Sequence, residues 1–278
     1  MSSLSNSTSD IEIRHPERWT LILRVGISDV RFILYSDEEE ESLISRSLPL
    51  EMSGRDYLSA LENCIYDNPV LIQDFKQVIV SVESSHFVVL PAEISDEDVR
   101  SEILDYMYAN DSGECCSCEV LPEKVSMAYT MPKGVVAFLQ RTFNMPKIVH
   151  HLVPLCTYSA IKSENSGVAK MFVHLYNSRM DLCAFRKGEL QVANTFYYRN
   201  EEEAAYYILN AWQTYGMDSL ADELQLTGDK SVRDFLMPLL RKYISYVMAI
   251  IFPASAMKLG QDAIKAPFDL ILLSQCVL

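Results

Sequence analysis

The first part of the chain alternates apolar and polar residues in the manner of β-strands. Two such runs fill Trp19–Tyr35, with the polar pair Ser28-Asp29 between them, and this period of two around a short break predicts a β-hairpin. Residues Ser42–Leu50 predict a third strand. Apolar residues at helical spacing then predict a helix over about 54–67, with Ser53 as its N-cap.

A buried strand and a second helix are expected next. Val78–Val82 is nearly continuous in apolar residues, which is typical of a strand buried on both faces. The polar run Ser95–Asp98 predicts the start of a helix. Asn110–Glu119 shows no regular period, whereas Val125–Met131 predicts a strand and Pro132 the start of a helix to about Phe143.

The opening pattern returns in the second half. Met171–Tyr176, Met180–Phe185 and Leu190–Tyr198 predict three strands, and they precede a helix, a short strand and another helix at Glu201–Tyr215, Leu224–Leu226 and Ser231–Ile244. Corresponding positions are separated by a nearly constant interval: Ser28 matches Ser178 and Val30 matches Met180, while Val78 matches Leu224. Strand-rich hairpins do recur in unrelated α/β proteins, but two units of similar length and order favour a duplication.

The repeat predicts an α/β protein with two β-β-β-α-β-α domains flanking a cleft, a common place for a ligand. We expect a disordered tail over 1–18, a first domain over 19–160 and a second over 161–278. At 278 residues the chain is near the minimum for two such halves, so we expect no room for a large inserted subdomain.

Composition narrows the classes of function that the chain could have. With 24 Lys and Arg against 38 Asp and Glu, the formal net charge is −14, which disfavours general nucleic-acid binding and docking on anionic lipid. The start of the chain has no basic and apolar leader, and seven cysteines fit free thiols in a reducing cytoplasm. The apolar stretch Tyr243–Met257 is too short to span a bilayer, so we expect a buried helix end or a core strand there.

Three segments resemble the nucleotide-binding loops of the actin, sugar-kinase and 70-kDa-chaperone superfamily. Ile22–Arg31 is similar to the first phosphate loop, Val173–Leu190 to the second and Leu224–Ser231 to the adenosine turn. The matching residues are Gly26, Ser28 and Val30, then Asp181, Leu182 and Gly188, then Thr227 and Gly228. Over about residues 19–278 the chain resembles a bacterial domain-of-unknown-function family of the branch that includes FtsA and PilM. The resemblance implies a duplicated actin-like (ribonuclease H-like) fold.

The departures from this pattern affect the chemistry. Arg24 and His174 stand where the superfamily has its two loop acids, and Tyr176, Asn177 and Ser178 replace three glycines. Hard oxygen ligands for Mg²⁺ and backbone amides that approach phosphates are therefore lost. A further change, Asp229, puts an acid in the adenosine turn. Any nucleotide would meet the residues that the resemblance assigns to cofactor binding: Gly26, Ser28, Ser178, Thr227 and Gly228. We assign no catalytic residue and no metal ligand.

We therefore expect a catalytically degenerate actin-like protein, a scaffold or assembly partner in the cytoplasm that needs no cofactor. By resemblance, its partner is a protein, such as part of a membrane-associated assembly, without direct membrane insertion; homodimerisation stays open. The alternative is an active ATP-binding protein or small-molecule kinase with atypical loops that uses ATP and Mg²⁺. A variant of this alternative needs no metal, because Arg24, Arg31 and Arg179 would form the anion site instead. A third alternative is a sensor that binds a small ligand in the cleft.

Cysteine and histidine residues suggest two further sites. Cys115, Cys116 and Cys118 are close in sequence, with His150-His151 as distant candidates for a zinc site. Zinc sites usually show paired ligands at both ends, and only one end is present here. A Cys/His nucleophile is the second idea, from Cys156 or Cys183 with His151 or His174, although free cysteines are commonly buried and inert. We expect neither site.

Overall fold

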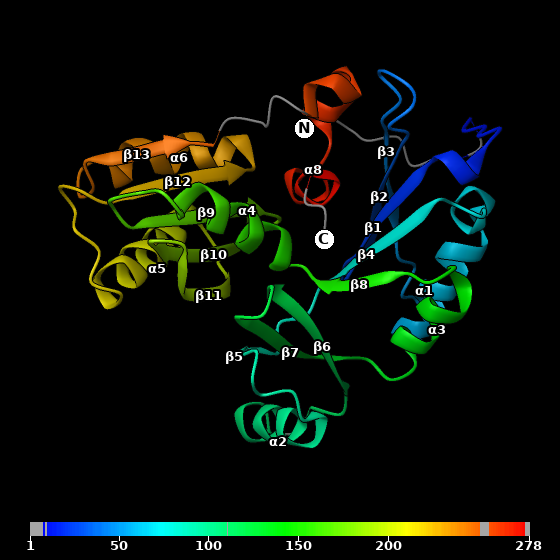
Figure 1. Ribbon diagram of the computed structural model, residues 1–278, viewed down its shortest axis with the longest axis horizontal. Coiled ribbons are helices and arrows are strands. Elements are labelled where there is room, and N and C mark those ends of the chain that lie inside the picture. Colours follow the sequence, from blue (N-terminus) through cyan, green and yellow to red (C-terminus); the bar gives the residue numbers. More distant parts are fainter. Residues whose placement is uncertain (1–7, 9, 110, 251–255, 276–278) are drawn as a thin grey trace. The chain divides into compact units, whose positions relative to one another are not determined.

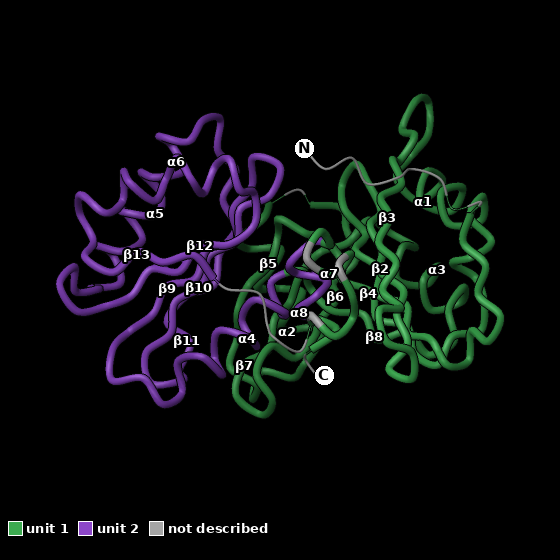
Figure 2. The backbone as a smooth tube through the Cα atoms, turned by 90° about the horizontal axis from the view of Figure 1, so that it is seen from above, with its two compact units in different colours: residues 1–151, 253–266, 273–278 green, residues 152–252, 267–272 purple. Residues whose placement is uncertain are grey.

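The chain divides into two compact units, and each is described separately (Figure 2). The computed structural model describes residue 8 and residues 10–109, 111–250 and 256–275. Unit 1 holds residues 1–151, 253–266 and 273–278, and unit 2 holds residues 152–252 and 267–272. Residues 1–7 and 9 of the tail expected over 1–18 lie outside the described residues, and Pro16–Arg18 forms a short 3-10 turn, η1.

Unit 1 is built on a five-stranded sheet of order β3-β2-β1-β4-β8. Its first three strands are antiparallel, whereas β1, β4 and β8 are parallel. The strands are β1 Thr20–Val25, β2 Asp29–Tyr35, β3 Ile44–Pro49, β4 Gln77–Val82 and β8 Lys147–His150. Every residue of β1 is buried, so the sheet is covered on both faces and the predicted hairpin and buried strand are confirmed.

Short helices accompany this sheet. They are α1 Tyr57–Tyr66, the 3-10 helix η2 Pro69–Ile72 and α3 Val135–Thr142 (Figure 1). The prediction that Ser53 caps the first helix was wrong. Asp56 is the N-cap, and its carboxylate accepts a hydrogen bond from the Ser59 backbone N–H at 2.8 Å. A carboxylate at this position satisfies an otherwise unpaired amide of the first turn and interacts favourably with the helix dipole.

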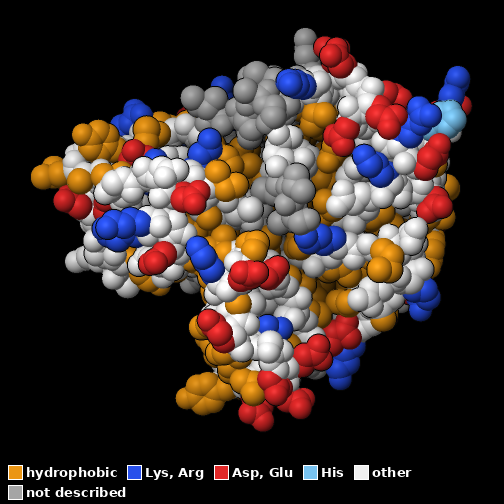
Figure 3. All heavy atoms as spheres, viewed as in Figure 1, with side chains coloured by type: hydrophobic (Ala, Val, Ile, Leu, Met, Phe, Trp, Pro, Cys, Tyr) orange, Lys and Arg blue, Asp and Glu red, His pale blue; other side chains and the backbone are white. Residues whose placement is uncertain are grey.

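A small subdomain is inserted between β4 and α3, although the chain length was expected to leave no room for a large one. It is a three-stranded antiparallel sheet of order β5-β7-β6 with one helix. The elements are β5 Phe87–Pro91, α2 Glu97–Met107, β6 Glu114–Leu121 and β7 Val125–Met131. Acidic side chains gather over α2 on the face shown in Figure 3. Strand β6 occupies the segment in which the sequence shows no regular period. The period is absent because the alternate residues of this strand are only partly buried.

Unit 2 repeats the architecture of the first sheet, in the order β11-β10-β9-β12-β13. The strands are β9 Lys170–Tyr176, β10 Arg179–Arg186, β11 Glu189–Tyr197, β12 Glu223–Gly228 and β13 Tyr246–Ala249, and the helices are α4 Val153–Ser163, α5 Glu201–Thr214 and α6 Lys230–Leu240. Helices α5 and α6 pack over an apolar face that includes Val173, Leu182 and Leu226. The stretch Tyr243–Met257 contains β13, and its residues 251–255 lie outside the described part.

The strand register confirms the internal repeat. Arg24 in β1 lies opposite Arg31 in β2 and beside Ser81 in β4. At the equivalent place in unit 2, His174 lies opposite Asp181 and beside Thr227. The second helix of each repeat is α3 in unit 1 and α6 in unit 2, rather than α2, which belongs to the insertion.

The C-terminal part adds η3 Ala256–Leu259, α7 Gln261–Lys265 and α8 Phe268–Gln275. In unit 1 this part is tied to the end of the β2–β3 connection, where the backbone N–H of Leu43 donates to the Leu259 carbonyl at 3.2 Å. Among the described residues, no helix has the length and apolar character needed to cross a membrane.

Candidate functional site

The first loop joins β1 to β2 and includes the predicted residues Gly26 and Ser28. The Gly26 N–H donates to the Asp29 carbonyl at 2.9 Å. A Cβ atom on Gly26 would lie 2.9 Å from that oxygen and 3.3 Å from a Glu83 carboxylate oxygen. Glycine is therefore required by the tight turn itself. Ser28 is exposed, and its carbonyl accepts from the Leu50 N–H at 2.9 Å.

Carboxylates surround this first loop. The Tyr57 hydroxyl donates to the Gly26 carbonyl at 2.8 Å, and the pKa of Tyr57 is raised by its burial and then by the charges of Glu83 and Asp29. Asp29 is neutralised in part by Arg31, whose Nε lies 2.8 Å from its carboxylate. Arg24 is fully buried on the strand behind the loop. The loop thus offers one ion-paired acid and a second carboxylate where the resemblance places a phosphate.

The second loop is a tight hairpin turn rather than a glycine-rich cradle. Tyr176 ends β9 and pairs with Arg179, which begins β10. The two residues between them, Asn177 and Ser178, have φ of 44° and 57°, the pattern of a two-residue type I′ turn. Ser178 is exposed, and its carbonyl accepts from the Tyr198 N–H at 2.9 Å. Asn and Ser therefore keep a backbone conformation that favours glycine.

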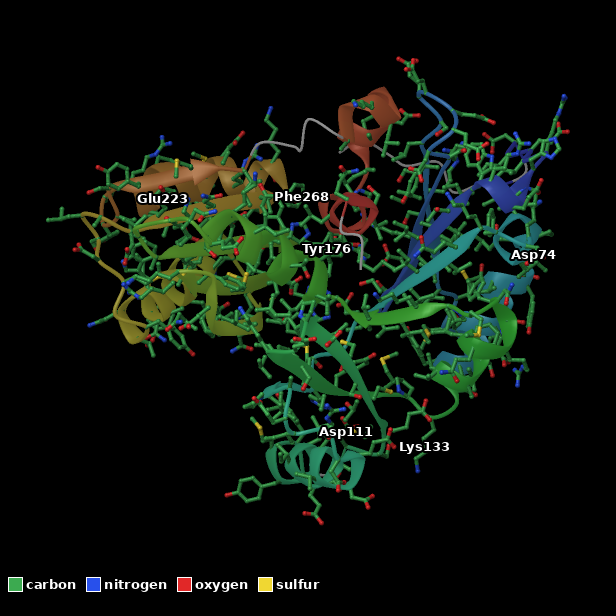
Figure 4. All side chains as sticks on the ribbon, in the orientation of Figure 1. Asp74, Asp111, Lys133, Tyr176, Glu223 and Phe268 are labelled. Atoms are coloured by element: carbon green, nitrogen blue, oxygen red, sulfur yellow. The ribbon has the colours of Figure 1, made fainter. Side chains whose placement is uncertain are left out.

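A buried ion pair lies directly behind this turn. One Asp181 carboxylate oxygen accepts from the Arg179 guanidinium at 3.1 Å, and the other accepts from the Thr195 hydroxyl at 2.9 Å. The Arg179 and Asp181 side chains are only 2% and 4% exposed. The Arg179 guanidinium also lies over the Tyr176 ring, 5.5 Å from its centroid, and Figure 4 labels Tyr176 at the end of β9. The one loop acid that the sequence retains is thus held by protein groups.

The third segment, at the end of β12, contains the predicted residues Thr227 and Gly228. Thr227 is buried beside His174. Gly228 has φ of 91°, and a Cβ atom there would overlap the Leu175 carbonyl oxygen. Asp229 follows as the N-cap of α6, and its carboxylate accepts from the Ser231 N–H at 2.9 Å. Gly228 is thus required by the close contact between β12 and β9, and Asp229 is explained by its capping of α6.

Comparison with known proteins identifies the family. A family model described as "Protein of unknown function (DUF3822)" matches residues 8–247. The chain belongs to this family. None of the curated proteins matches it.

Solved structures show the fold. A Bacteroides thetaiotaomicron VPI-5482 protein described as having an actin-like ATPase fold and unknown function is similar with a TM-score of 0.79 and 22% identity, over 96% of this chain and 99% of that chain. The PilM-PilN type IV pilus biogenesis complex contains a chain that is similar with a TM-score of 0.56 and 12% identity, over 91% and 96% of the two chains. The DUF3822 chain therefore has the actin-like fold, and the resemblance stated from its sequence is confirmed.

The predicted site residues fall into two groups. Gly26 and Ser28 belong to unit 1, whereas Ser178, Thr227 and Gly228 belong to unit 2. Sequence reasoning missed Thr195, Tyr57 and Glu83. The Lys187-Gly188 turn signals the hairpin that brings Thr195 near Asp181, but only the register shift between Ala184 and Phe185 places Thr195 rather than Asn194 opposite it. Tyr57 and Glu83 gave no comparable signal, because tertiary packing brings them to the first loop.

The cysteine and histidine candidates are dispersed. Cys115 and Cys116 are neighbours on β6 and so point to opposite faces of the strand. The Cys118 sulfur accepts a hydrogen bond from the His150 backbone N–H at 3.4 Å. The His150 imidazole takes no part in this interaction. In the described part of the chain, no group of three or more His, Cys, Asp or Glu side chains is placed to hold a metal ion. Cys183 is buried and contacts Ser159 at 3.4 Å.

Proposed function

We propose that this DUF3822 chain is a catalytically degenerate actin-like protein that works as a scaffold or assembly partner in the cytoplasm. The observation that carries the proposal is the buried Arg179–Asp181–Thr195 cluster. Both oxygens of the Asp181 carboxylate accept hydrogen bonds from protein groups. If Asp181 were to serve a metal-bound nucleotide it would have to give up these contacts, and breaking a buried ion pair by removing one partner costs about 3–5 kcal/mol.

The residues around both loops support the loss of phosphoryl transfer. That reaction depends on positioning and on neutralisation of phosphate charge, usually by Mg²⁺ held through carboxylates. Arg24 and His174 occupy the two equivalent positions where the resemblance places acids. Two acids that remain near the loops, Asp29 and Asp181, are each paired with an arginine. These residues do not fit a magnesium–nucleotide complex of the superfamily's kind.

The first loop also disfavours a nucleotide on electrostatic grounds. The Gly26 amide is used within its own turn, and the Glu83 carboxylate lies against the same glycine. A polyphosphate brought to this loop without a metal would meet like charge at short range, which costs more as water is excluded. The net charge of −14 adds to this repulsion at long range.

A protein partner is the remaining part of the proposal. The similar PilM chain was solved in a complex with PilN, named as a type IV pilus biogenesis complex. An actin-like chain that has lost its chemistry retains a large folded surface on which other proteins can assemble. We propose that the partner of this chain is a protein of a membrane-associated assembly, and that no nucleotide is needed for their contact.

Thermal unfolding with ATP or ADP, each with and without Mg²⁺, tests the first part. We expect no change in melting temperature. A rise of several degrees that is lost in Arg24→Ala and kept in Lys187→Ala, a change at an exposed residue of the β10–β11 turn in unit 2, would establish the alternative of an active ATP-binding protein. Unfolding of each variant without nucleotide separates loss of binding from loss of folding.

Cross-linked pull-down from native cells tests the second part. We expect one protein to be captured reproducibly and then to bind the purified chain at a fixed ratio without nucleotide. The absence of any reproducible partner, or a partner that binds only after ATP is added, would contradict the proposal.

A further inference from the structure

A polar cavity of about 470 Å³ lies within unit 1, at the carboxyl ends of two parallel strands. Ile27 follows β1 and Glu83 follows β4, and the inserted subdomain closes the other side with His86, Asp111 and Lys133. Figure 4 labels Asp111 and Lys133 in the region of β6 and β7. The volume of the cavity is in the range of small-molecule sites. The carboxyl edge of parallel strands is also where α/β sheets commonly bind ligands.

The cavity contains a fixed histidine–carboxylate pair. The Asp111 Oδ2 atom lies 2.5 Å from His86 Nδ1 and 2.5 Å from the Thr130 hydroxyl, and its other oxygen accepts from the Gly113 N–H at 2.9 Å. Burial raises the pKa of Asp111, but the hydrogen bonds from Thr130, His86 and Gly113 outweigh it and lower the pKa. An ionised Asp111 accepts from all three groups, so Nδ1 carries a proton.

This arrangement aims the second ring nitrogen of His86 away from Asp111. The imidazole stacks on the Tyr108 ring, with centroids 4.5 Å apart and planes at 18°, so stacking and the Asp111 contact together fix its orientation. The side chain is still 45% exposed. A histidine held in this way presents Nε2 as a defined acceptor for a ligand proton donor.

The charges around the cavity have both signs. Glu83 and His86 Nε2 are acceptors, Lys133 supplies an ammonium group, and Ser85 and Ser112 supply hydroxyls. A ligand with only negative charge would be repelled by Glu83 and Asp111, and one with only positive charge by Lys133. A molecule with one ammonium and one carboxylate group matches both, since charge complementarity determines which ligand a polar site selects.

We propose that this cavity binds a free amino acid, with its ammonium group toward His86 Nε2 and Glu83 and its carboxylate toward Lys133. The apolar side chains of Ile27, Met131 and Pro132 line the remaining wall and would contact the ligand's side chain. The inference does not rest on the proposed scaffold function, because every lining residue belongs to unit 1 and none of the phosphate-loop chemistry is used.

Calorimetry on the full chain tests the proposal, with the twenty amino acids added one at a time at millimolar concentration. We expect at least one of them to bind saturably, and acetate and methylammonium, which carry one charge each, to bind at least about tenfold more weakly. His86→Gln and Lys133→Ala should each weaken that binding by about tenfold or more. Lys133 is exposed, so its variant keeps the test valid if His86→Gln fails to fold.

A matched control comes from a second histidine–carboxylate pair. His15 Nδ1 lies 3.1 Å from the Glu17 carboxylate on an open surface, and His15→Gln should leave the binding unchanged. The proposal is overturned if no amino acid binds, if acetate alone binds as tightly, or if His15→Gln weakens binding as much as His86→Gln does. Backbone amide shifts should confirm the location, with changes at Ser85 and Gly113 on addition of the amino acid.

Discussion

Arg179 and Asp181 form an ion pair at 3.1 Å inside unit 2, immediately behind the turn that replaces a phosphate loop. They lie on one strand, two residues apart, so both side chains point to the same face of the sheet. That face also carries Thr195, whose hydroxyl completes the contacts of the Asp181 carboxylate. In the resemblance to the superfamily, Asp181 is a retained loop residue, whereas in this fold it stabilises the hairpin.

Asp181→Ala should therefore lower the free energy of unfolding by about 3 kcal/mol, because it leaves the Arg179 charge buried without its carboxylate. Urea denaturation followed by circular dichroism measures this change. Lys265→Ala is the matched control, since Lys265 and Asp262 also lie 3.1 Å apart but are each 58% exposed, and it should cost less than about 1 kcal/mol. Equal losses in the two variants would show that the buried pair has no structural role.

The turn residues of the second loop allow a stabilising change. Ser178 has φ of 57°, a conformation that costs non-glycine residues free energy. Ser178→Gly should raise the free energy of unfolding by about 1 kcal/mol, seen as a higher melting temperature. Ser178→Ala, which keeps the strain, should show no gain. A lower melting temperature in Ser178→Gly would indicate that the serine side chain itself stabilises the turn.

Gly228 should be much less tolerant of substitution than Gly216, although both have positive φ. A Cβ atom on Gly228 would overlap the backbone of Leu175, whereas a Cβ atom on Gly216 would meet nothing within 4 Å. We expect Gly216→Ala to cost about 1–2 kcal/mol and Gly228→Ala at least about 3 kcal/mol in unfolding experiments. Similar costs at both sites would contradict the close approach of β12 to β9.

A surface carboxylate should titrate far below its ordinary range. The Glu203 carboxylate accepts from the Arg199 guanidinium at 3.0 Å and 3.1 Å and from the Arg199 backbone N–H at 2.7 Å. These bonds, the side-chain bond first, lower the pKa of Glu203 from 4.5 to about 2. Because the folded pKa is the lower one, the stabilisation is fully present above pH 4.5 and is lost as the pH falls through about 2.

Arg199→Ala should return the pKa of Glu203 toward 4.5 and reduce the loss of stability on acidification over that pH window. Carboxyl chemical shifts across a pH titration measure the first effect, and melting temperatures at each pH measure the second. Glu202→Gln, in the same helical turn, should leave the titration of Glu203 unchanged. A Glu203 carboxyl that titrates near 4.5 in the unmodified chain would contradict the prediction.

Much of the fold could be predicted because its signals are local. The alternation in Trp19–Tyr35 and Met171–Phe185 depends only on neighbouring residues, and the register of both hairpins follows from the turns between them. The constant interval that matched Ser28 with Ser178 is therefore preserved between equivalent strand positions, such as Arg24 and His174. The inserted strand β6 was missed because its alternate residues are only half-buried and its polar residues hide the period.

The sequence by itself determined the duplicated sheets, the two hairpins and the loss of the loop acids, since each depends on residues close together in the chain. Only the tertiary structure decided what those loops became. The Glu83 carboxylate against Gly26, the Thr195 hydroxyl on Asp181 and the pairing of His86 with Asp111 all join different elements. Such contacts depend on how elements pack, and the inserted subdomain that completes the polar cavity has no counterpart in the repeat that the sequence displays.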